Sequence, residues 1–221
     1  MKTSFLVILL LAAAVCTHGQ RPRAEEVKDS KGNPVLIGEK YFIQPVKSNG
    51  GGLVPAPANI FPLCPLGITQ TLLPFQPGLP VSFQYYTISV IHSPLYVSLS
   101  TVIKFESDFW PVCKDFSKVW GVDVSSSAGR EPNIIIGGKD TALESAFKVE
   151  KATGENTYKL TINVYGTVGT IPGAWGGAPQ LVATNDEAKT LFVKFVKVDA
   201  TKATTSTSRV EKLGLRMFPF Y

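Results

Sequence analysis

The stretch GGGLVPAPANIFPLCPLGITQTLLPFQPGLP, residues 50–80, is the feature around which the rest of the chain is organised. It holds seven prolines, five glycines and one cysteine, and it contains no charged residue. Surface loops are usually polar, because their backbone groups and side chains face water. A stretch this rich in Pro and Gly is not expected to form one regular element. It is therefore expected either to pack beneath the fold or to meet an apolar partner.

Residues 1–19 have the features of a secretory signal peptide. Lys2 supplies the positive start, residues 5–15 the apolar core, and Thr17 and Gly19 the small residues of a cleavage site. The apolar run is too short to span a bilayer and no second one follows, so we expect no stable membrane anchor. The expected location is the secretory pathway, with an endoplasmic reticulum-derived body, the vacuole and the extracellular space or cell wall left open.

The remaining chain fits one domain, residues 20–199, followed by a C-terminal extension, residues 200–221. The extension begins with the polar sequence ATKATTSTS, which is typical of a solvated linker. It ends in an apolar segment, Leu213–Tyr221, for which a removable sorting signal is one hypothesis. The net charge of +5 is modest and Lys and Arg are not clustered, so nucleic acid is not an expected partner.

Cysteine usage predicts one disulfide. Cys16 is lost with the signal peptide, which leaves Cys64 and Cys113. In an oxidising compartment, two cysteines most simply pair with each other. Closing a loop of this length contributes about 4 kcal/mol to stability in the chain-entropy model.

The hydrophobic pattern predicts an all-β fold of about twelve short strands. Val97–Phe105 alternates with a period of two, and no long amphipathic helix is found; Thr141–Ala146 offers at most one helical turn. Strand starts recur near Tyr41, Val102 and Tyr158, about sixty residues apart, which suggests three similar units. The expected strands also include Tyr41–Val46, Val81–Phe83 running into the aromatic and β-branched residues 84–96, Val119–Val122, Asn133–Ile136, Phe147–Glu150, Tyr158–Val164 and Leu191–Val198.

Several segments resemble the plant Kunitz family, whose type member is the soybean trypsin inhibitor. They are Asp29–Gly38 with Tyr41-Phe42-Ile43, Cys64-Pro65, Gly78-Leu79-Pro80-Val81, Ile103-Lys104-Phe105, Phe147–Lys151 and Tyr158-Lys159-Leu160. The resemblance covers nearly all of residues 20–199 and implies a β-trefoil. Cys64 and Cys113 match the first disulfide of that family, and the second disulfide is absent.

Within that family, the opening stretch is similar to the water-soluble chlorophyll proteins of the cabbage family. The similarity lies in Tyr41–Pro45, Gly50–Ala56, Leu63–Ile68, Gln76–Pro80 and Phe109-Trp110-Pro111. Those proteins bind chlorophyll outside photosynthesis, as homotetramers that enclose the pigment in an apolar cavity. The resemblance therefore implies a chlorophyll-binding homotetramer with a scavenging or photoprotective role under stress.

The resemblance also assigns roles to single residues. It places the magnesium of chlorophyll on the backbone carbonyl of Pro55, and magnesium as a hard cation prefers oxygen. Gln76 would donate a hydrogen bond to the pigment, or alternatively serve as a turn amide that bonds its own backbone. Trp110 would pack against the pigment or at the tetramer centre, or alternatively lie in the core beside the disulfide. Further candidates for lining the cavity are Leu53, Val54, Phe75 and Trp175.

Protease inhibition is the main alternative, since it is the common role of the Kunitz family. The corresponding loop, residues 84–96, has no Lys or Arg, which argues against trypsin as a target. Tyr85, Tyr86 or Leu95 would suit a chymotrypsin-like protease, and a papain-like cysteine protease is a further candidate partner. His92 is expected to be a surface loop residue.

We do not expect an enzyme. With the signal peptide removed, the chain has one His, no free Cys and no phosphate-binding glycine loop that opens a helix. A stress-induced binding protein whose pigment site has decayed is a third alternative.

Overall fold

The computed structural model of the chain describes residues 24–47, 50–59, 61–87, 90–107, 113–126, 131–173 and 176–199. In these ranges the chain forms twelve β-strands, three short 3-10 helices and no α-helix, which confirms the all-β prediction. The strands are β1 (Tyr41–Pro45), β2 (Leu53–Pro57), β3 (Leu66–Gln70), β4 (Val81–Tyr85), β5 (Ser100–Phe105), β6 (Trp120–Val122), β7 (Ile134–Ile136), β8 (Phe147–Lys151), β9 (Tyr158–Ile162), β10 (Gly166–Pro172), β11 (Pro179–Thr184) and β12 (Phe192–Lys197). The 3-10 helices are η1 (Val124–Ser126), η2 (Leu143–Ser145) and η3 (Glu187–Lys189).

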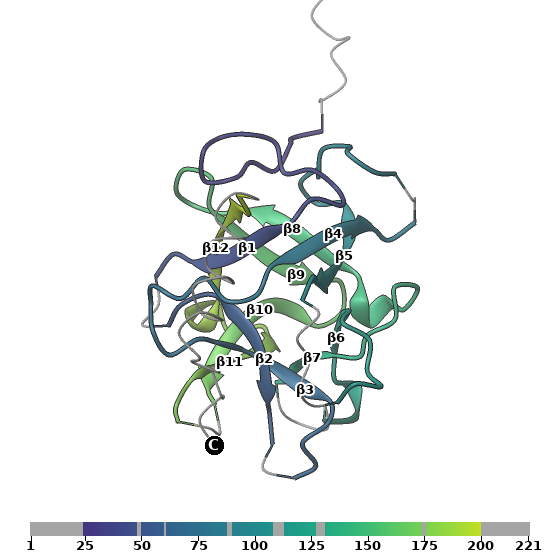
Figure 1. Cartoon of the computed structure of the whole chain (residues 1–221), viewed down its shortest axis with the longest axis vertical. Helices are drawn as coiled ribbons and strands as arrows, with labels where there is room; N and C mark the ends of the chain where they lie inside the picture. Colours follow the sequence, from purple (N-terminus) through teal and green to yellow (C-terminus); the bar gives the residue numbers. More distant parts are fainter. Residues whose placement is uncertain are drawn as a thin grey trace, which may run out of the picture.

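Six of the strands close into a barrel. They pair in the order β12-β1-β4-β5-β8-β9, and β12 also pairs with β9, so the ring is complete. These strands occupy the upper half of the molecule in Figure 1. Closure leaves no strand edge exposed in the barrel itself.

The other six strands form three hairpins, β2–β3, β6–β7 and β10–β11, in the lower half of Figure 1. The hairpins are joined to one another through β3, which pairs with both β11 and β7. A six-stranded barrel capped by three hairpins is a β-trefoil. Its three units begin at β1, β5 and β9, which agrees with the recurrence near Tyr41, Val102 and Tyr158.

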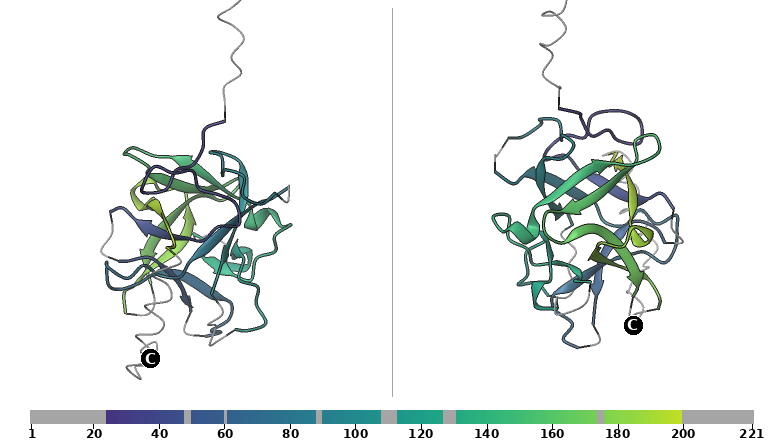
Figure 2. Two further views of the ribbon diagram at one scale, coloured as in Figure 1. Left: turned by 45° about the horizontal axis from the view of Figure 1, so that its top comes forward. Right: turned by 180° about the vertical axis from the view of Figure 1, so that it is seen from behind.

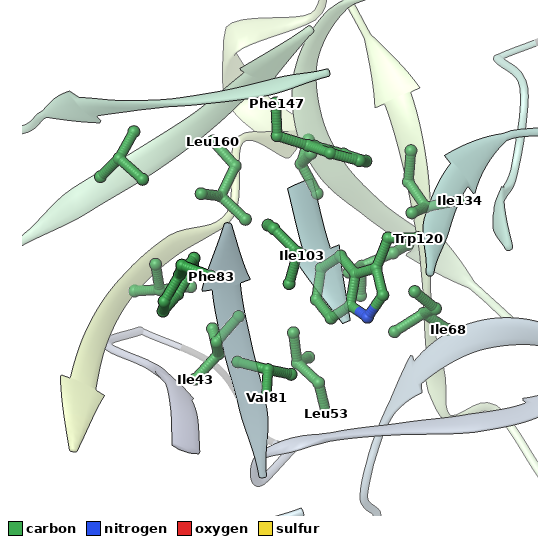
Figure 3. Packing of buried hydrophobic residues seen from close by; sticks show 14 of the residues in the cluster. Ile43, Leu53, Ile68, Val81, Phe83, Ile103, Trp120, Ile134, Phe147 and Leu160 are labelled. Carbon is green, nitrogen blue, oxygen red and sulfur yellow. The ribbon is translucent and has the colours of Figure 1, made fainter. Parts of the chain in front are cut away.

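The core lies inside the barrel and beneath the hairpins. Most barrel strands bury alternate residues, as the period-two pattern predicts. β9 buries Tyr158, Leu160 and Ile162, whereas β5 buries Val102 as well as Thr101, Ile103 and Phe105. Figure 3 shows Trp120 between Ile103 and Ile134 in this cluster. Its indole packs against Phe105 and Phe147 with ring centroids 5.4 and 6.1 Å away. The buried ring therefore connects the β6–β7 hairpin with the barrel.

The N-terminal segment, residues 24–40, covers the end of the barrel opposite the hairpins. Figures 1 and 2 show this segment in purple across that end. Val27 and Val35 are buried there, and two barrel tyrosines fix its backbone. The hydroxyl of Tyr158 accepts from the Lys28 N–H at 2.7 Å, and that of Tyr41 from the Leu36 N–H at 2.9 Å. Burial raises the pKa of both phenols.

Residues 50–80 do not form one regular element, as expected, but they contain the two short strands β2 and β3. The hairpin can hold prolines in its outer strand, because a missing N–H costs no ladder bond there. One expectation about the strands was wrong. The strand expected to continue through residues 84–96 ends at Tyr85, the last residue of β4. His92 has φ of 60°, which is incompatible with extended backbone. The helical turn expected within Thr141–Ala146 is confirmed as η2.

Within the described residues, no helix has the length and apolar character that crossing a bilayer requires.

Candidate functional site

The Pro55 carbonyl lies on the outer edge of the β2–β3 hairpin. Among the described residues, β2 pairs only with β3, with Val54 opposite Thr69 and Pro55 opposite Ile68. Successive residues of an antiparallel strand direct their backbone groups alternately toward and away from the partner. Thr71 donates to the Gly52 carbonyl at 2.9 Å, so Gly52, Val54 and Ala56 face β3.

The intervening residues of β2 face the other way. The Leu53 carbonyl accepts from the Leu79 N–H at 2.8 Å on the side opposite β3. Pro55 and Pro57 follow at intervals of two, so their carbonyls point to that same outer side. The Pro55 carbonyl, to which the resemblance assigns the magnesium, therefore lies outside the β2–β3 ladder.

Residues 71–80, which we call the strap, cross directly over Gly50–Gly52. The Gly51 N–H donates to Thr71 and the Gly52 N–H to Gln76, both at 2.8 Å. A Cβ on Gly52 would lie 1.9 Å from the Pro77 carbonyl oxygen, and one on Gly51 2.3 Å from the Leu73 oxygen. The three glycines therefore permit a backbone-to-backbone approach that any side chain would prevent.

A glutamine that the sequence analysis did not single out also positions the strap. The Gln44 side-chain amide, on β1, donates to the Pro77 carbonyl at 2.8 Å. This bond connects the strap to the barrel, thirty-three residues away in sequence. The resemblance covered Gln44 within Tyr41–Pro45, but nothing in the local pattern indicated a partner so distant in the chain.

Large apolar side chains are exposed along the stretch. Phe61 is 89 % exposed, Phe75 80 % and Leu72 61 %, and Leu63 and Leu73 are also exposed. Phe61 and Leu63 lie in the β2–β3 connection, whereas Leu72, Leu73 and Phe75 lie in the strap, so they flank the hairpin at both ends. We call these five residues the apolar set. The stretch thus holds five of the thirteen large apolar side chains that are exposed among the described residues, which makes it the candidate site.

Gln76 lies in the strap, with its backbone fully engaged. Its N–H donates to the Leu73 carbonyl at 3.0 Å, and its carbonyl accepts from Gly52. The side chain is half-buried. None of the hydrogen bonds recorded among the described residues involves its side-chain amide, so they give no support to the alternative of a turn amide bonded to its own backbone.

The predicted disulfide is present. Cys64 and Cys113 are bonded, with their Cα atoms 5.7 Å apart. The bond joins the β2–β3 connection to the segment that leads into β6. It therefore holds one end of the apolar set against the rest of the fold.

The other predicted lining residues have different positions. Val54 is half-buried and Phe75 is exposed, so both are accessible. Leu53 is 1 % exposed and belongs to the hydrophobic core, which corrects its assignment as a lining residue. Trp110 and Trp175 lie outside the described residues, and their roles stay predictions.

The residues predicted for an inhibitory loop are mostly unsuited to that role. Leu95 is fully buried, and Tyr85 is buried with its hydroxyl donating to the Pro94 carbonyl, which corrects both assignments. Tyr86 is half-buried and donates to the Thr141 carbonyl at 2.7 Å. His92 is exposed, as expected, and its ring lies 3.5 Å from Glu39. Among the described residues of this loop, the exposed large apolar ones are Val90 and Ile91, which the sequence analysis missed.

The described residues contain no cluster of three or more His, Cys, Asp or Glu that would bind a metal ion through side chains. Elsewhere in the described residues, a charged cluster joins Glu131, just before β7, to η3. Lys189 contacts both carboxylate oxygens of Glu131 at 2.8 and 2.9 Å, and Thr184 donates to the same carboxylate. The hydrogen bonds from Lys189 and Thr184 lower the pKa of Glu131, and the bond to Glu131 raises the pKa of Lys189.

The fold is a β-trefoil, and the candidate site combines one hairpin with the strap. Residues 27–199 match the Kunitz legume model, described as trypsin and protease inhibitor. The chain belongs to this Kunitz family.

Two Arabidopsis thaliana relatives match over nearly their whole length. Kunitz trypsin inhibitor 2 is 58 % identical over 214 residues, covering 94 % of this chain and 95 % of that protein. Kunitz trypsin inhibitor 1 is 33 % identical over 229 residues, covering 100 % and 97 %.

Two of the similar solved structures correspond to the two functions considered from the sequence, chlorophyll binding and protease inhibition. The water-soluble chlorophyll protein from Brassica oleracea var. Botrytis with chlorophyll b is 68 % identical, with a TM-score of 0.75. It covers 79 % of this chain and 99 % of that one. Soybean trypsin inhibitor in complex with porcine pancreatic trypsin is 26 % identical, with a TM-score of 0.66, and covers 79 % and 100 %. The trefoil and the likeness to water-soluble chlorophyll proteins are thereby both confirmed.

Proposed function

We propose that this chain binds chlorophyll, using the outer edge of β2 and the apolar set. The carrying observation is the direction of the Pro55 carbonyl, which points away from β3, in a hairpin flanked by five exposed apolar side chains. The similarity to a protein solved with chlorophyll b supports this assignment. A hard main-chain oxygen in a hairpin with apolar side chains at both ends fits a magnesium-bearing ring with a hydrocarbon tail.

Each part of the site has a distinct task. The Pro55 carbonyl would hold the magnesium, and the pigment itself supplies light absorption. The Gln76 amide would donate a hydrogen bond to an oxygen at the ring edge. Phe75, Leu72 and Phe61 would exclude water from the ring; burying about 400 Å2 of apolar surface at about 25 cal/mol per Å2 contributes about 10 kcal/mol before the costs of association.

We further propose that the loaded protein is a homotetramer. A protomer presents an edge and a few apolar side chains, which leave the other face of a flat ring in water. Copies that share the pigment would bury that face together with the apolar set, which removes an aggregation hazard. Restricting oxygen access to the enclosed pigment would give a scavenging or photoprotective role under stress, within the secretory pathway.

Comparing chlorophyll with its magnesium-free derivative, pheophytin, tests the role of the carbonyl. Binding is followed by titrating the refolded protein with each pigment in mild detergent and recording the red absorption band. We expect chlorophyll to bind about tenfold or more tightly, because pheophytin keeps the apolar ring but loses the metal–oxygen bond. Equal affinities would contradict the assignment of Pro55, and binding of neither pigment would contradict the function.

Protease inhibition is the second candidate, favoured by the family match and by exposed Val90 and Ile91 in the loop that follows β4. A substrate-like inhibitor needs an extended loop, and the left-handed φ of His92 interrupts it directly after Ile91. The lack of Lys and Arg in residues 84–96 also disfavours trypsin. Titration against trypsin, chymotrypsin and papain tests this candidate: stoichiometric loss of papain or chymotrypsin activity supports it, and three flat curves exclude it.

A further inference from the structure

The outer edge of β2 combines two features that together favour aggregation. It is a strand edge that, among the described residues, pairs on one side only, and it lies in the stretch with the apolar set. An open strand edge can pair with a strand of another copy, and adjacent apolar side chains strengthen such pairing. The backbone of β2 shows how the chain avoids this.

The first residue of the edge is covered by the strap. The Leu53 carbonyl accepts from the Leu79 N–H, and a Cβ on Gly78 would lie 2.4 Å from both the nitrogen and the oxygen of Leu53. The backbone of the strap therefore occupies this position, and an incoming strand has no access to Leu53.

The next two outward-facing residues are Pro55 and Pro57. Neither has an N–H group, so both contribute a carbonyl acceptor and no donor. Their oxygens are separated by about 7 Å, the spacing of alternate residues in a strand. A pairing strand needs donors and acceptors in alternation, and β2 offers acceptors alone on this side.

We propose that the outer edge of β2 is an acceptor-only surface. It can bind hydrogen-bond donors or a hard cation, but it cannot form a β-ladder with a strand of a second copy. Pro57 tests the prevention of strand pairing most clearly. The proposed pigment site uses the Pro55 carbonyl, whereas Pro57 has no assigned part in pigment binding. Pro57 thus keeps pigment-free chains from joining through β2. This inference does not depend on the identity of the ligand.

The test is Pro57→Val in the pigment-free protein, since valine restores the N–H and favours strands. In a symmetric pair, each copy would gain one hydrogen bond to the other. We expect self-association at a concentration about tenfold or more below that of the wild type, measured by light scattering during gel filtration. Infrared spectra of the associated species should gain an intermolecular β band.

Pro34→Val is the matched control, because Pro34 is an exposed proline in the N-terminal segment, away from β2. Pro57→Ala restores the same N–H with a smaller side chain, and it replaces the valine variant if circular dichroism shows that the latter is misfolded. A folded Pro57 variant that stays as dispersed as the wild type would overturn the proposal. So would equal association by the Pro34 variant.

Discussion

Replacing the Gln76 side chain is expected to separate pigment binding from folding. Its backbone bonds hold the strap, and these do not depend on the side chain. We expect Gln76→Leu to leave thermal unfolding unchanged, and to weaken chlorophyll binding about tenfold or shift the red absorption band. The measurement is a pigment titration followed by absorbance.

Gln84→Leu is the control for that change, because Gln84 is an exposed glutamine on β4. The assignment of Gln76 would be wrong if both variants bound pigment with the affinity and spectrum of the wild type.

Glu131 gives the chain a pH-dependent contribution to stability. Its pKa is lowered in the folded state by hydrogen bonds from Lys189 and Thr184, so folding favours the ionised carboxylate. The contribution is present above the carboxyl group's ordinary pKa and is lost as the pH falls through the lowered, folded-state pKa. We expect Glu131→Gln to lower the melting temperature by a few degrees at pH 7, and the difference to shrink in acid.

Melting curves of both proteins from pH 7 down to pH 3 check this expectation. Glu187→Gln, at the start of η3, removes a nearby exposed carboxylate as a control. A Glu131 difference that stayed constant with pH would show that the carboxylate's charge is not its cause.

Among the structural elements, the strap depends on its contact with Gly50–Gly52. Because a Cβ on Gly52 would lie 1.9 Å from a backbone oxygen, Gly52→Ala must displace the strap or strain it. We expect a loss of about 2–4 kcal/mol in the free energy of unfolding, or a folded protein with a displaced strap and weakened pigment binding. Chemical denaturation and pigment titration distinguish these two forms of damage.

Gly32→Ala is the comparison, since Gly32 has φ of 84° and no atom within 4 Å of its added Cβ. Its cost is conformational alone, about 1 kcal/mol. If Gly52→Ala cost no more than Gly32→Ala and left pigment binding intact, the close contact would not be required.

The Cys64–Cys113 bond is the covalent counterpart of the strap contact, at the other end of the hairpin. It spans 49 residues, so in the chain-entropy model the double variant Cys64→Ala with Cys113→Ala loses about 4 kcal/mol of stability. Denaturant unfolding of both proteins measures the loss. A loss below about 1 kcal/mol would indicate that other contacts fix the β2–β3 connection.

Across the whole molecule, local patterns predicted the barrel better than the site. The alternation through Thr101, Ile103 and Phe105 is visible in sequence because burial on one face of a strand has a period of two. The local sequence did not predict β2, because a strand can hold two prolines only at the edge of a sheet. Which strands lie at an edge is decided by tertiary pairing.

In the candidate site, too, some features were predictable from local sequence and others depend on tertiary contacts. The uncharged stretch indicated an apolar partner, and the two cysteines indicated their own bond. The inward orientation of Leu53, the burial of Leu95 and the bond from Gln44 to the strap depend on which segments meet in space. No window of sequence contains both partners of such a contact.

Gel filtration of the full protein mixed with chlorophyll, with absorbance at the red band and light scattering for mass, tests pigment binding most directly. We expect pigment and protein to elute together at a mass near four protomers, while protein without pigment elutes as a smaller species. Elution of all the pigment apart from the protein, with the protein's mass unchanged, would contradict the account.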